Sequence, residues 1–266
     1  MRLLDYLLAQ DLAPDEHSAR GLIMRGDVLV NNQPVTSPAA EVEADSAIRL
    51  RAEAYADASR GAAKLRPAIE RTGFDCAGRV ALDLGAATGG FTQVLLEQGA
   101  ASVYAVDVAY GALAHELRQD PRVIVVERTN ARSLTREHLP EPPSAVVGDL
   151  SFISWTAVLP AVAPLLADVA ALLLLIKPQF ELAARGKSEL VPGGIVRDGA
   201  AIHDCLAGLY NTWVEQALGP QAVVPAGVRG AKGNQEYFVY LRRGEPGLSR
   251  ESYSACIAEA VAEATP

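Results

Sequence analysis

The hydrophobic positions of the first 50 residues predict a small unit of two helices followed by short strands. Apolar side chains recur at helical spacing in two stretches, and Gly26 ends the second. The positions that carry these patterns are Leu3, Leu4, Leu7 and Leu8, then Ala19, Leu22 and Ile23. Apolar runs at 28–30 and 48–50 are typical of strands, and the polar stretch 31–34 indicates a turn after the first run. We expect the order helix, helix, strand, turn, strand.

From residue 80 onward, short apolar runs alternate with helical stretches. The runs that predict buried strands lie at 80–83, 102–107, 123–126, 145–149 and 170–177. This alternation predicts a mostly parallel sheet with helices on both faces. Two closing strands are expected at 222–224 and 236–241, and the glycine-rich connection between them favours an antiparallel last strand. The fold class is therefore α/β: a doubly wound, mostly parallel, seven-stranded Rossmann-like sheet preceded by a small α+β unit.

Composition narrows the classes of protein that the sequence fits. The chain has 266 residues, half of them hydrophobic, which is enough for one large core and a small second one. The formal net charge of −8 argues against a protein that coats nucleic acid over its whole surface. Three widely separated cysteines indicate neither a zinc site nor a disulfide framework, so we expect no bound metal. The acid at Asp5 and the lack of an apolar run of about 18 residues favour a cytoplasmic protein without a signal peptide or a membrane span.

A cofactor signal follows the first strand of the large unit. The strand runs into Asp-Leu-Gly-Ala-Ala-Thr-Gly-Gly-Phe at 83–91 and then into a helical stretch, the layout of a nucleotide-cofactor site. A dinucleotide site needs glycine where Ala87 stands, so that the backbone can approach a pyrophosphate. S-adenosylmethionine has no phosphate and fits this turn better than NAD, which is the alternative. Asp107 can accept hydrogen bonds from a ribose diol, and Asn130 can border the adenine or the methionine end. The candidate cofactor residues are Asp83, Gly85, Ala86, Thr88, Gly89, Gly90, Phe91, Asp107, Asn130 and Asp149.

Four charged residues are predicted to converge at the carboxyl edge of the sheet, where open α/β sheets bind ligands. Asp149 and Lys177 end predicted parallel strands, Glu236 begins the last strand, and Lys64 precedes the first. This cluster is suited to deprotonating a ribose 2′-hydroxyl, which is a poor nucleophile. A lysine serves as the base only when neutral. Desolvation and a second cation at Lys64 favour the neutral form of Lys177, whereas the two acids oppose it, and the sequence leaves this balance open.

The N-terminal unit resembles the S4 RNA-binding domain. The resemblance rests on Arg-Leu-Leu-Asp at 2–5 and on Ser-Ala-Arg-Gly-Leu-Ile-Met-Arg-Gly-Asp-Val-Leu-Val-Asn-Asn at 18–32. It implies that Arg2, Arg20 and Arg25 contact RNA phosphates. The segment departs from a basic RNA-binding surface, because residues 1–50 hold four arginines and no lysine against eight acids. A small structural cap is the alternative interpretation.

Seven ordered motifs resemble the TlyA family, whose members combine an S4 domain with an FtsJ-like ribosomal RNA 2′-O-methyltransferase and were historically called hemolysins. The motifs are Ser-Arg-Gly-x-x-Lys-Leu (59–65), Asp-Leu-Gly-Ala-x-Thr-Gly-Gly-Phe-Thr (83–92), Val-Tyr-Ala-Val-Asp-Val-x-Tyr-Gly (103–111), Glu-Arg-Thr-Asn-Ala-Arg (127–132), Asp-x-Ser-Phe-Ile-Ser (149–154), Lys-Pro-Gln-Phe-Glu (177–181) and Lys-Gly-Asn-Gln-Glu-Tyr (232–237). The resemblance implies S-adenosylmethionine as cofactor, a cytidine ribose of ribosomal RNA within a ribosomal subunit as substrate, and a catalytic tetrad of Lys64, Asp149, Lys177 and Glu236.

The resemblance also implies a division of the chain. We expect an S4-like RNA-binding domain at 1–55, a linker at 56–61, an FtsJ-like methyltransferase domain at 62–245 and a helical tail at 246–266. Only Met1 precedes Arg2, and this short beginning favours the large ribosomal subunit as target, with the small subunit as the alternative. Basic residues in predicted loops can hold RNA phosphates, although scattered surface charge is an equal alternative. They are Arg60, Arg132, Arg185, Lys187, Arg197, Arg229 and Lys232.

Three other functions compete with this interpretation. A membrane-active hemolysin requires amphipathic or spanning segments that the sequence does not show. A non-catalytic RNA-binding factor for ribosome assembly does not require the glycine turn and the four charged positions. Methylation of DNA or protein amino groups is expected to use an Asn-Pro-Pro-Tyr type motif, where this chain has Asp-Leu-Ser-Phe at 149–152. We therefore expect neither a DNA nor a membrane partner.

Overall fold

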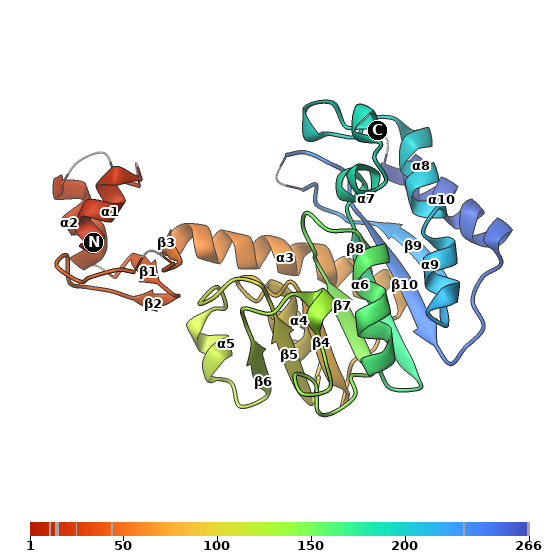
Figure 1. Ribbon diagram of the computed structural model, residues 1–266, viewed down its shortest axis with the longest axis horizontal. Helices are drawn as coiled ribbons and strands as arrows, with labels where there is room; N and C mark the ends of the chain where they lie inside the picture. The colour runs from red at the N-terminus through yellow and green to blue at the C-terminus, as the bar shows by residue number, and fades with distance from the viewer. Residues whose placement is uncertain (11, 14–15, 25, 44, 231, 265–266) are drawn as a thin grey trace.

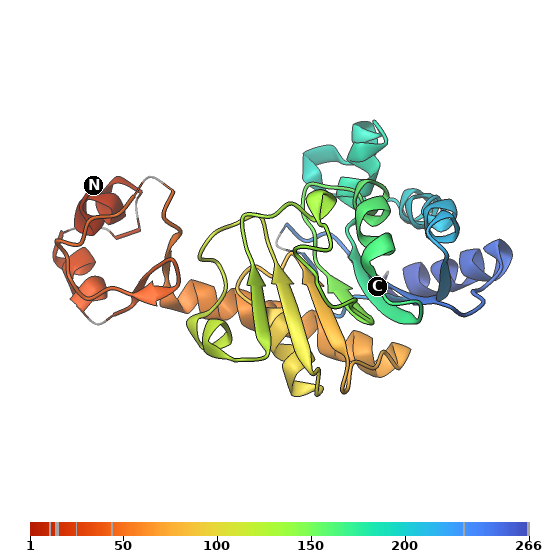
Figure 2. The ribbon, with the colours of Figure 1, turned by 60° about the horizontal axis from the view of Figure 1, so that its bottom comes forward.

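The computed structural model describes residues 1–10, 12–13, 16–24, 26–43, 45–230 and 232–264, with the backbone alone for residues 17, 18 and 51–59. A small N-terminal unit and a larger unit are joined by the long helix α3, Arg51–Thr72 (Figure 1). The N-terminal unit lies to one side of the larger one in both ribbon views (Figure 2). Function must therefore be sought in the larger unit and where the two units touch.

The N-terminal unit packs two helices on a three-stranded antiparallel sheet of order β2-β1-β3. Its elements are α1 Leu3–Ala9, α2 Glu16–Met24, β1 Val28–Val30, β2 Gln33–Pro34 and β3 Ile48–Leu50. The expected turn at 31–34 is shorter in the structure, because Val30 pairs with Gln33 around a two-residue turn. Asn31 and Asn32 make this turn at φ +50° and +59°, a left-handed conformation that asparagine tolerates better than most residues.

Helix α3 contains residues 56–61, which the sequence interpretation assigned to a linker. The helix is continuous from Arg51 to Thr72, and it ends where Gly73 adopts the left-handed conformation at φ +67°. The stretch is rich in alanine, the strongest helix former, so the connection between the units is helical. The domain boundaries themselves remain a prediction.

The larger unit contains a seven-stranded sheet of order β6-β5-β4-β7-β8-β10-β9. The strands are β4 Val80–Leu84, β5 Ser102–Val106, β6 Val123–Val126, β7 Ala145–Gly148, β8 Ala170–Ile176, β9 Leu218–Pro225 and β10 Tyr237–Arg243. Strand β10 runs antiparallel to both β8 and β9, whereas β4 to β8 pair in parallel. The α/β prediction is confirmed, and so is its antiparallel last strand. The expected run at 222–224 is only the middle of a longer β9.

Helices cover both faces of this sheet. The helices after α3 are α4 Gly90–Glu97, α5 His115–Gln119, α6 Trp155–Val162, α7 Pro178–Ala184, α8 Gly199–Ala207, α9 Tyr210–Glu215 and α10 Arg250–Ala264. Successive residues of β8 alternate between two cores: Leu173 packs with α3 and α4, and Leu174 packs with α6, α8 and α9. The C-terminal tail forms α10, whose Tyr253 and Ile257 join the second core. Within the described residues, no helix is long and apolar enough to cross a membrane.

Candidate active site

The turn after β4 depends on glycines at two close approaches. Gly85 has φ +83°, and a Cβ there would lie 2.7 Å from the carbonyl oxygen of Asp149 at the end of β7. Gly89 precedes α4 at φ +96°, and a Cβ there would lie 2.8 Å from Cδ1 of Leu113. Backbone blocks a side chain at Gly85, leucine side chains would have to shift at Gly89, and an L-residue would be strained at both positions. These glycines bring the ends of β4 and β7 and the start of α4 close together.

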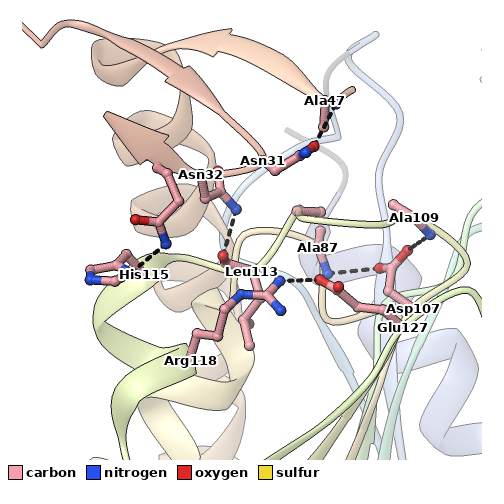
Figure 3. A network of polar contacts seen from close by, with 12 residues as sticks. Asn31, Asn32, Ala47, Ala87, Asp107, Ala109, Leu113, His115, Arg118 and Glu127 are labelled. Carbon is pink, nitrogen blue, oxygen red and sulfur yellow. Dashed lines mark hydrogen bonds and ion pairs between the residues drawn. The ribbon is translucent and has the colours of Figure 1, made fainter. Parts of the chain in front are cut away.

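Asp107 is fixed by the turn that it faces. Its Oδ2 accepts a hydrogen bond from the Ala87 N–H at 2.8 Å, and its Oδ1 accepts one from the Ala109 N–H at 2.7 Å (Figure 3). Ala87 has φ +46° and stands where a dinucleotide turn carries glycine. Its N–H is thus engaged by a carboxylate of the protein. The remaining lone pairs of Asp107 can accept bonds from a diol.

Asp83 lies beneath the turn and has no exposed surface. Its Oδ2 accepts a hydrogen bond from Thr92 Oγ1 at 2.7 Å, which ties β4 to α4. Burial raises the pKa of the Asp83 carboxyl to about 7, against the lowering effect of the Thr92 hydrogen bond. Its Oδ1 has no hydrogen-bond partner among the described residues.

The four charged residues predicted to converge do lie together. Lys64 Nζ is 2.8 Å from Glu236 Oε2 and 3.6 Å from Asp149 Oδ2. Lys177 Nζ forms an ion pair with the other oxygen of Asp149 and donates a hydrogen bond to Ser151 Oγ at 2.9 Å. Asp149 therefore lies between two amines that come from α3 and from the end of β8.

Burial differs within this cluster. Lys64 and Glu236 are buried, whereas the side chains of Lys177 and Asp149 retain 11% and 21% of their exposure. Burial is the strongest single effect on Lys64 and lowers its pKa, but the carboxylates of Asp149 and Glu236 together outweigh it, and the pKa is raised. The two carboxylates thus favour the charged form of Lys64.

A cavity of about 330 Å³ joins the glycine turn to the charged cluster. Its lining residues are Arg49, Arg60, Gly61, Lys64, Gly85, Ala86, Ala87, Thr88, Gly90, Phe91, Asp149, Ser151 and Lys177. Most of the predicted cofactor positions therefore face one space together with Lys64, Asp149 and Lys177. Asn130 instead caps a short 3₁₀ turn, Ala131–Ser133, by accepting a hydrogen bond from the Arg132 N–H at 3.0 Å. Its contact with a cofactor remains a prediction.

Two residues that sequence reasoning missed follow the cavity-lining Ser151 and Lys177 along the chain. Phe152 follows Ser151 at φ +62° with 88% of its surface exposed, and its ring lies 4.7 Å from that of Phe180. Glu181 is buried and accepts hydrogen bonds from Ser154 Oγ at 2.5 Å and the Trp155 N–H at 2.9 Å. Burial raises the pKa of Glu181. Both residues lie inside quoted motifs, but only tertiary contacts reveal what they do.

The residues predicted to bind RNA lie in several settings. Arg2 pairs with Asp5 at 2.8 Å and Arg20 pairs with Glu16 at 2.7 Å, so both carry a neighbouring acid. Arg25 lies outside the described residues. Arg60 lines the cavity. Of the other six, Arg185 is half-buried, and five are exposed: Arg132, Lys187, Arg197, Arg229 and Lys232. Their contacts with RNA stay a prediction.

Comparison with known proteins agrees with this geometry. The model of the FtsJ-like methyltransferase family matches residues 58–243. The chain is 40% identical over 259 residues, 97% of this chain and 96% of the relative, to the 16S/23S rRNA (cytidine-2′-O)-methyltransferase TlyA of Mycobacterium tuberculosis. The chain belongs to the TlyA family of FtsJ-like methyltransferases.

Other members of this family are similar along most of their length. Hemolysin A of Brachyspira hyodysenteriae is 35% identical over 242 residues, covering 91% of this chain and 99% of the relative. A solved structure from Streptococcus thermophilus, whose name describes it provisionally as a hemolysin, superposes with a TM-score of 0.72 at 30% identity. It covers 99% of this chain and 96% of its own, so the TlyA-family similarity includes the N-terminal unit as well as the sheet.

Proposed function

We propose that this protein transfers a methyl group from S-adenosylmethionine to the 2′-hydroxyl of a cytidine ribose in ribosomal RNA. The observation that carries the proposal is the cluster of Lys64, Asp149, Lys177 and Glu236, the first three of which line one cavity with the glycine turn. Membership of the TlyA family supports the same chemistry, because a relative with 40% identity is named for it.

The residues of the turn fit this cofactor. Asp107, oriented by two backbone N–H groups, is suited to hold the ribose diol of an adenosine. The Ala87 N–H already bonds to Asp107, so the turn does not offer it to a pyrophosphate. Gly85, Ala86 and Ala87 line the cavity at the turn. When bound, S-adenosylmethionine supplies an electrophilic methyl group on a sulfonium.

Lys177 is proposed as the general base. The neutral amine of Lys177 would accept the proton of the 2′-hydroxyl, and the bound cofactor would supply the methyl group and leave as its neutral thioether. Asp149 lies within ion-pair distance of the amines of Lys64 and Lys177 and holds both in position. Glu236 compensates the charge of Lys64 and keeps its amine pointed at Asp149. Ser151 Oγ, at 2.9 Å from Lys177 Nζ, orients that amine before the hydroxyl arrives.

Phe152 supports a nucleoside as the substrate. A base must leave its stack before its ribose can enter a cavity of this size, and an unstacked base needs a new stacking partner. Phe152 is 88% exposed, directly follows Ser151 of the cavity lining, and its ring lies 4.7 Å from that of Phe180. Stacking on one aromatic ring contributes about 1–3 kcal/mol per base.

The proposal is tested by transfer of labelled methyl from S-adenosylmethionine to purified 30S and 50S subunits, each lacking the modification. Label should appear at an alkali-resistant cytidine, and Lys177→Ala should abolish it, whereas the control Arg71→Ala, an exposed residue of α3 paired with Glu263 outside the cavity lining, should retain most of it. The comparison of subunits decides the target, with the large subunit favoured. Cofactor binding without transfer to either subunit would reject the proposal and favour an RNA-binding assembly factor.

A further inference from the structure

The N-terminal unit contacts the loop that begins at Asp107, the residue proposed to bind the ribose of the cofactor. This cofactor loop, residues 107–115, runs from Asp107 to the start of α5. Asn32, in the β1–β2 turn, is buried, and its Nδ2 donates a hydrogen bond to the Leu113 carbonyl at 2.5 Å (Figure 3). This is a specific polar contact between residues 81 positions apart. It places a fully desolvated amide at the junction of the two units.

Arg49 adds a second link to the same loop. Its Nη2 donates to Asn32 Oδ1 at 2.6 Å and to the Ala112 carbonyl at 2.7 Å. One guanidinium thus fixes both the asparagine and the loop that the asparagine holds. Arg49 also lines the 330 Å³ cavity, so the N-terminal unit contributes to its wall.

The contact is close as well as polar. Gly111 has φ +68°, and a Cβ there would lie 2.6 Å from the Cβ of Asn31. The neighbouring residue, Tyr110, stacks with Arg128, whose guanidinium carbon lies 4.2 Å from the centroid of the Tyr110 ring. Arg128 also donates a hydrogen bond to Asp45 of the N-terminal unit at 3.3 Å. The cofactor loop is therefore touched at several consecutive positions.

The cofactor loop packs directly on the glycine turn. Leu113 is buried, and its Cδ1 lies 2.8 Å from the position that a Cβ of Gly89 would take. The next residue, Ala114, donates its N–H to the Thr88 carbonyl at 3.2 Å. A shift of Leu113 would therefore move a wall of the turn, because tightly packed interiors transmit small displacements.

We infer that Asn32 and Arg49 are positioning residues for the cofactor: by holding the cofactor loop against Gly89, docking of the N-terminal unit sets the affinity of the site for the adenosine half of its ligand. The inference rests on the proposed function for the identity of that ligand. Binding and docking are then linked, and each strengthens the other by the same factor.

The test is equilibrium binding of S-adenosylhomocysteine to the full-length chain by calorimetry, without RNA. Asn32→Asp tolerates the left-handed turn and keeps an acceptor for Arg49, but it presents an oxygen to the Leu113 carbonyl in place of the N–H donor. We expect its affinity to fall by roughly tenfold, the size of one lost buried hydrogen bond. Asn211→Asp, the same substitution on the distant helix α9, should leave affinity unchanged.

A second pair of variants does not depend on hydrogen bonding. Gly111→Ala places a methyl group against Asn31, whereas Gly73→Ala imposes a similar backbone strain, at φ +67°, where a Cβ meets nothing within 4 Å. Only Gly111→Ala should weaken S-adenosylhomocysteine binding, and only it should speed amide hydrogen exchange in the cofactor loop. This pair also carries the test if Asn32→Asp does not fold.

The outcomes separate the inference from the proposed function. A wild-type protein that does not bind S-adenosylhomocysteine would overturn the cofactor assignment itself. A wild-type protein that binds, with Asn32→Asp and Gly111→Ala within about twofold of their controls, would overturn the positioning role alone.

Discussion

The cofactor side and the catalytic side of the candidate active site stabilise their acidic residues in different ways. On the cofactor side, Asp83 accepts a hydrogen bond from the neutral hydroxyl of Thr92, and burial raises its pKa to about 7. On the catalytic side, Glu236 and Asp149 face the amines of Lys64 and Lys177. One side thus relies on backbone geometry and neutral donors, and the other on paired charges. The difference predicts that the two sides respond differently to substitution and to pH.

The largest effect is expected from removing the proposed base. Lys177→Met should lower turnover by about 10³-fold, within the range of general base catalysis, while S-adenosylhomocysteine affinity stays close to wild type. Asp107→Ala should instead weaken that affinity by roughly tenfold, because a diol loses its acceptor. Single-turnover kinetics and calorimetry on both variants measure the split. Equal losses of affinity would show that the two sides do not act separately.

The next effect concerns the buried ion pair of Lys64 and Glu236. Lys64→Met leaves Glu236 buried without its cation, and we expect the free energy of unfolding to fall by about 3–5 kcal/mol. The double variant Lys64→Met/Glu236→Gln should recover much of this loss, since no uncompensated charge remains. Urea denaturation of the two variants and of Glu236→Gln gives the coupling between them. A strictly additive double variant would contradict the pairing.

Features that depend on a few neighbouring residues could be predicted from the sequence, and features that depend on tertiary contacts could not. The parallel strands, the glycine turn and the antiparallel β10 follow from patterns within a few residues, and each was predictable. Strand β2 was missed, because its two residues become a strand only through pairing with β1. Helix α3 was interrupted by an expected linker, although its alanine content predicts a continuous helix.

The same distinction between local and tertiary features applies to the candidate site. Lys64, Asp149, Lys177 and Glu236 were placed together because they occupy strand ends or ordered motifs, and the structure brings them together. The contact between Asn32 and Leu113 gives no sequence signal, since it requires the N-terminal unit to dock on the cofactor loop. The paired acids beside Arg2 and Arg20 are local and could have been recognised as i,i+3 and i,i+4 partners.

Asp83, whose carboxyl accepts a hydrogen bond from the neutral Thr92 hydroxyl, should make the stability of the protein depend on pH. The folded protein raises the pKa of Asp83 from 3.8 to about 7, so the folded state keeps its proton longer than the unfolded state. Stability therefore falls as pH rises through the window from about 4 to about 7, by up to roughly 4 kcal/mol. Asp83→Asn keeps an acceptor for Thr92 and should remove this slope, so that it is more stable than wild type at pH 8. Parallel pH profiles of the two proteins would contradict the assignment.

The smallest effect is expected at the glycine turn, where the cofactor side depends on backbone geometry. Gly85→Ala adds a methyl group 2.7 Å from the Asp149 carbonyl oxygen, whereas Gly78→Ala adds one at φ +66° where nothing lies within 4 Å. Backbone strain alone should cost Gly78→Ala about 1 kcal/mol of unfolding free energy, and the close approach should cost Gly85→Ala roughly 1–2 kcal/mol more. Because Gly85 lines the cavity and Gly78 does not, only Gly85→Ala should weaken S-adenosylhomocysteine binding. Equal losses in both variants, measured by urea denaturation and calorimetry, would mean that the turn tolerates a side chain and that its glycines serve conformation alone.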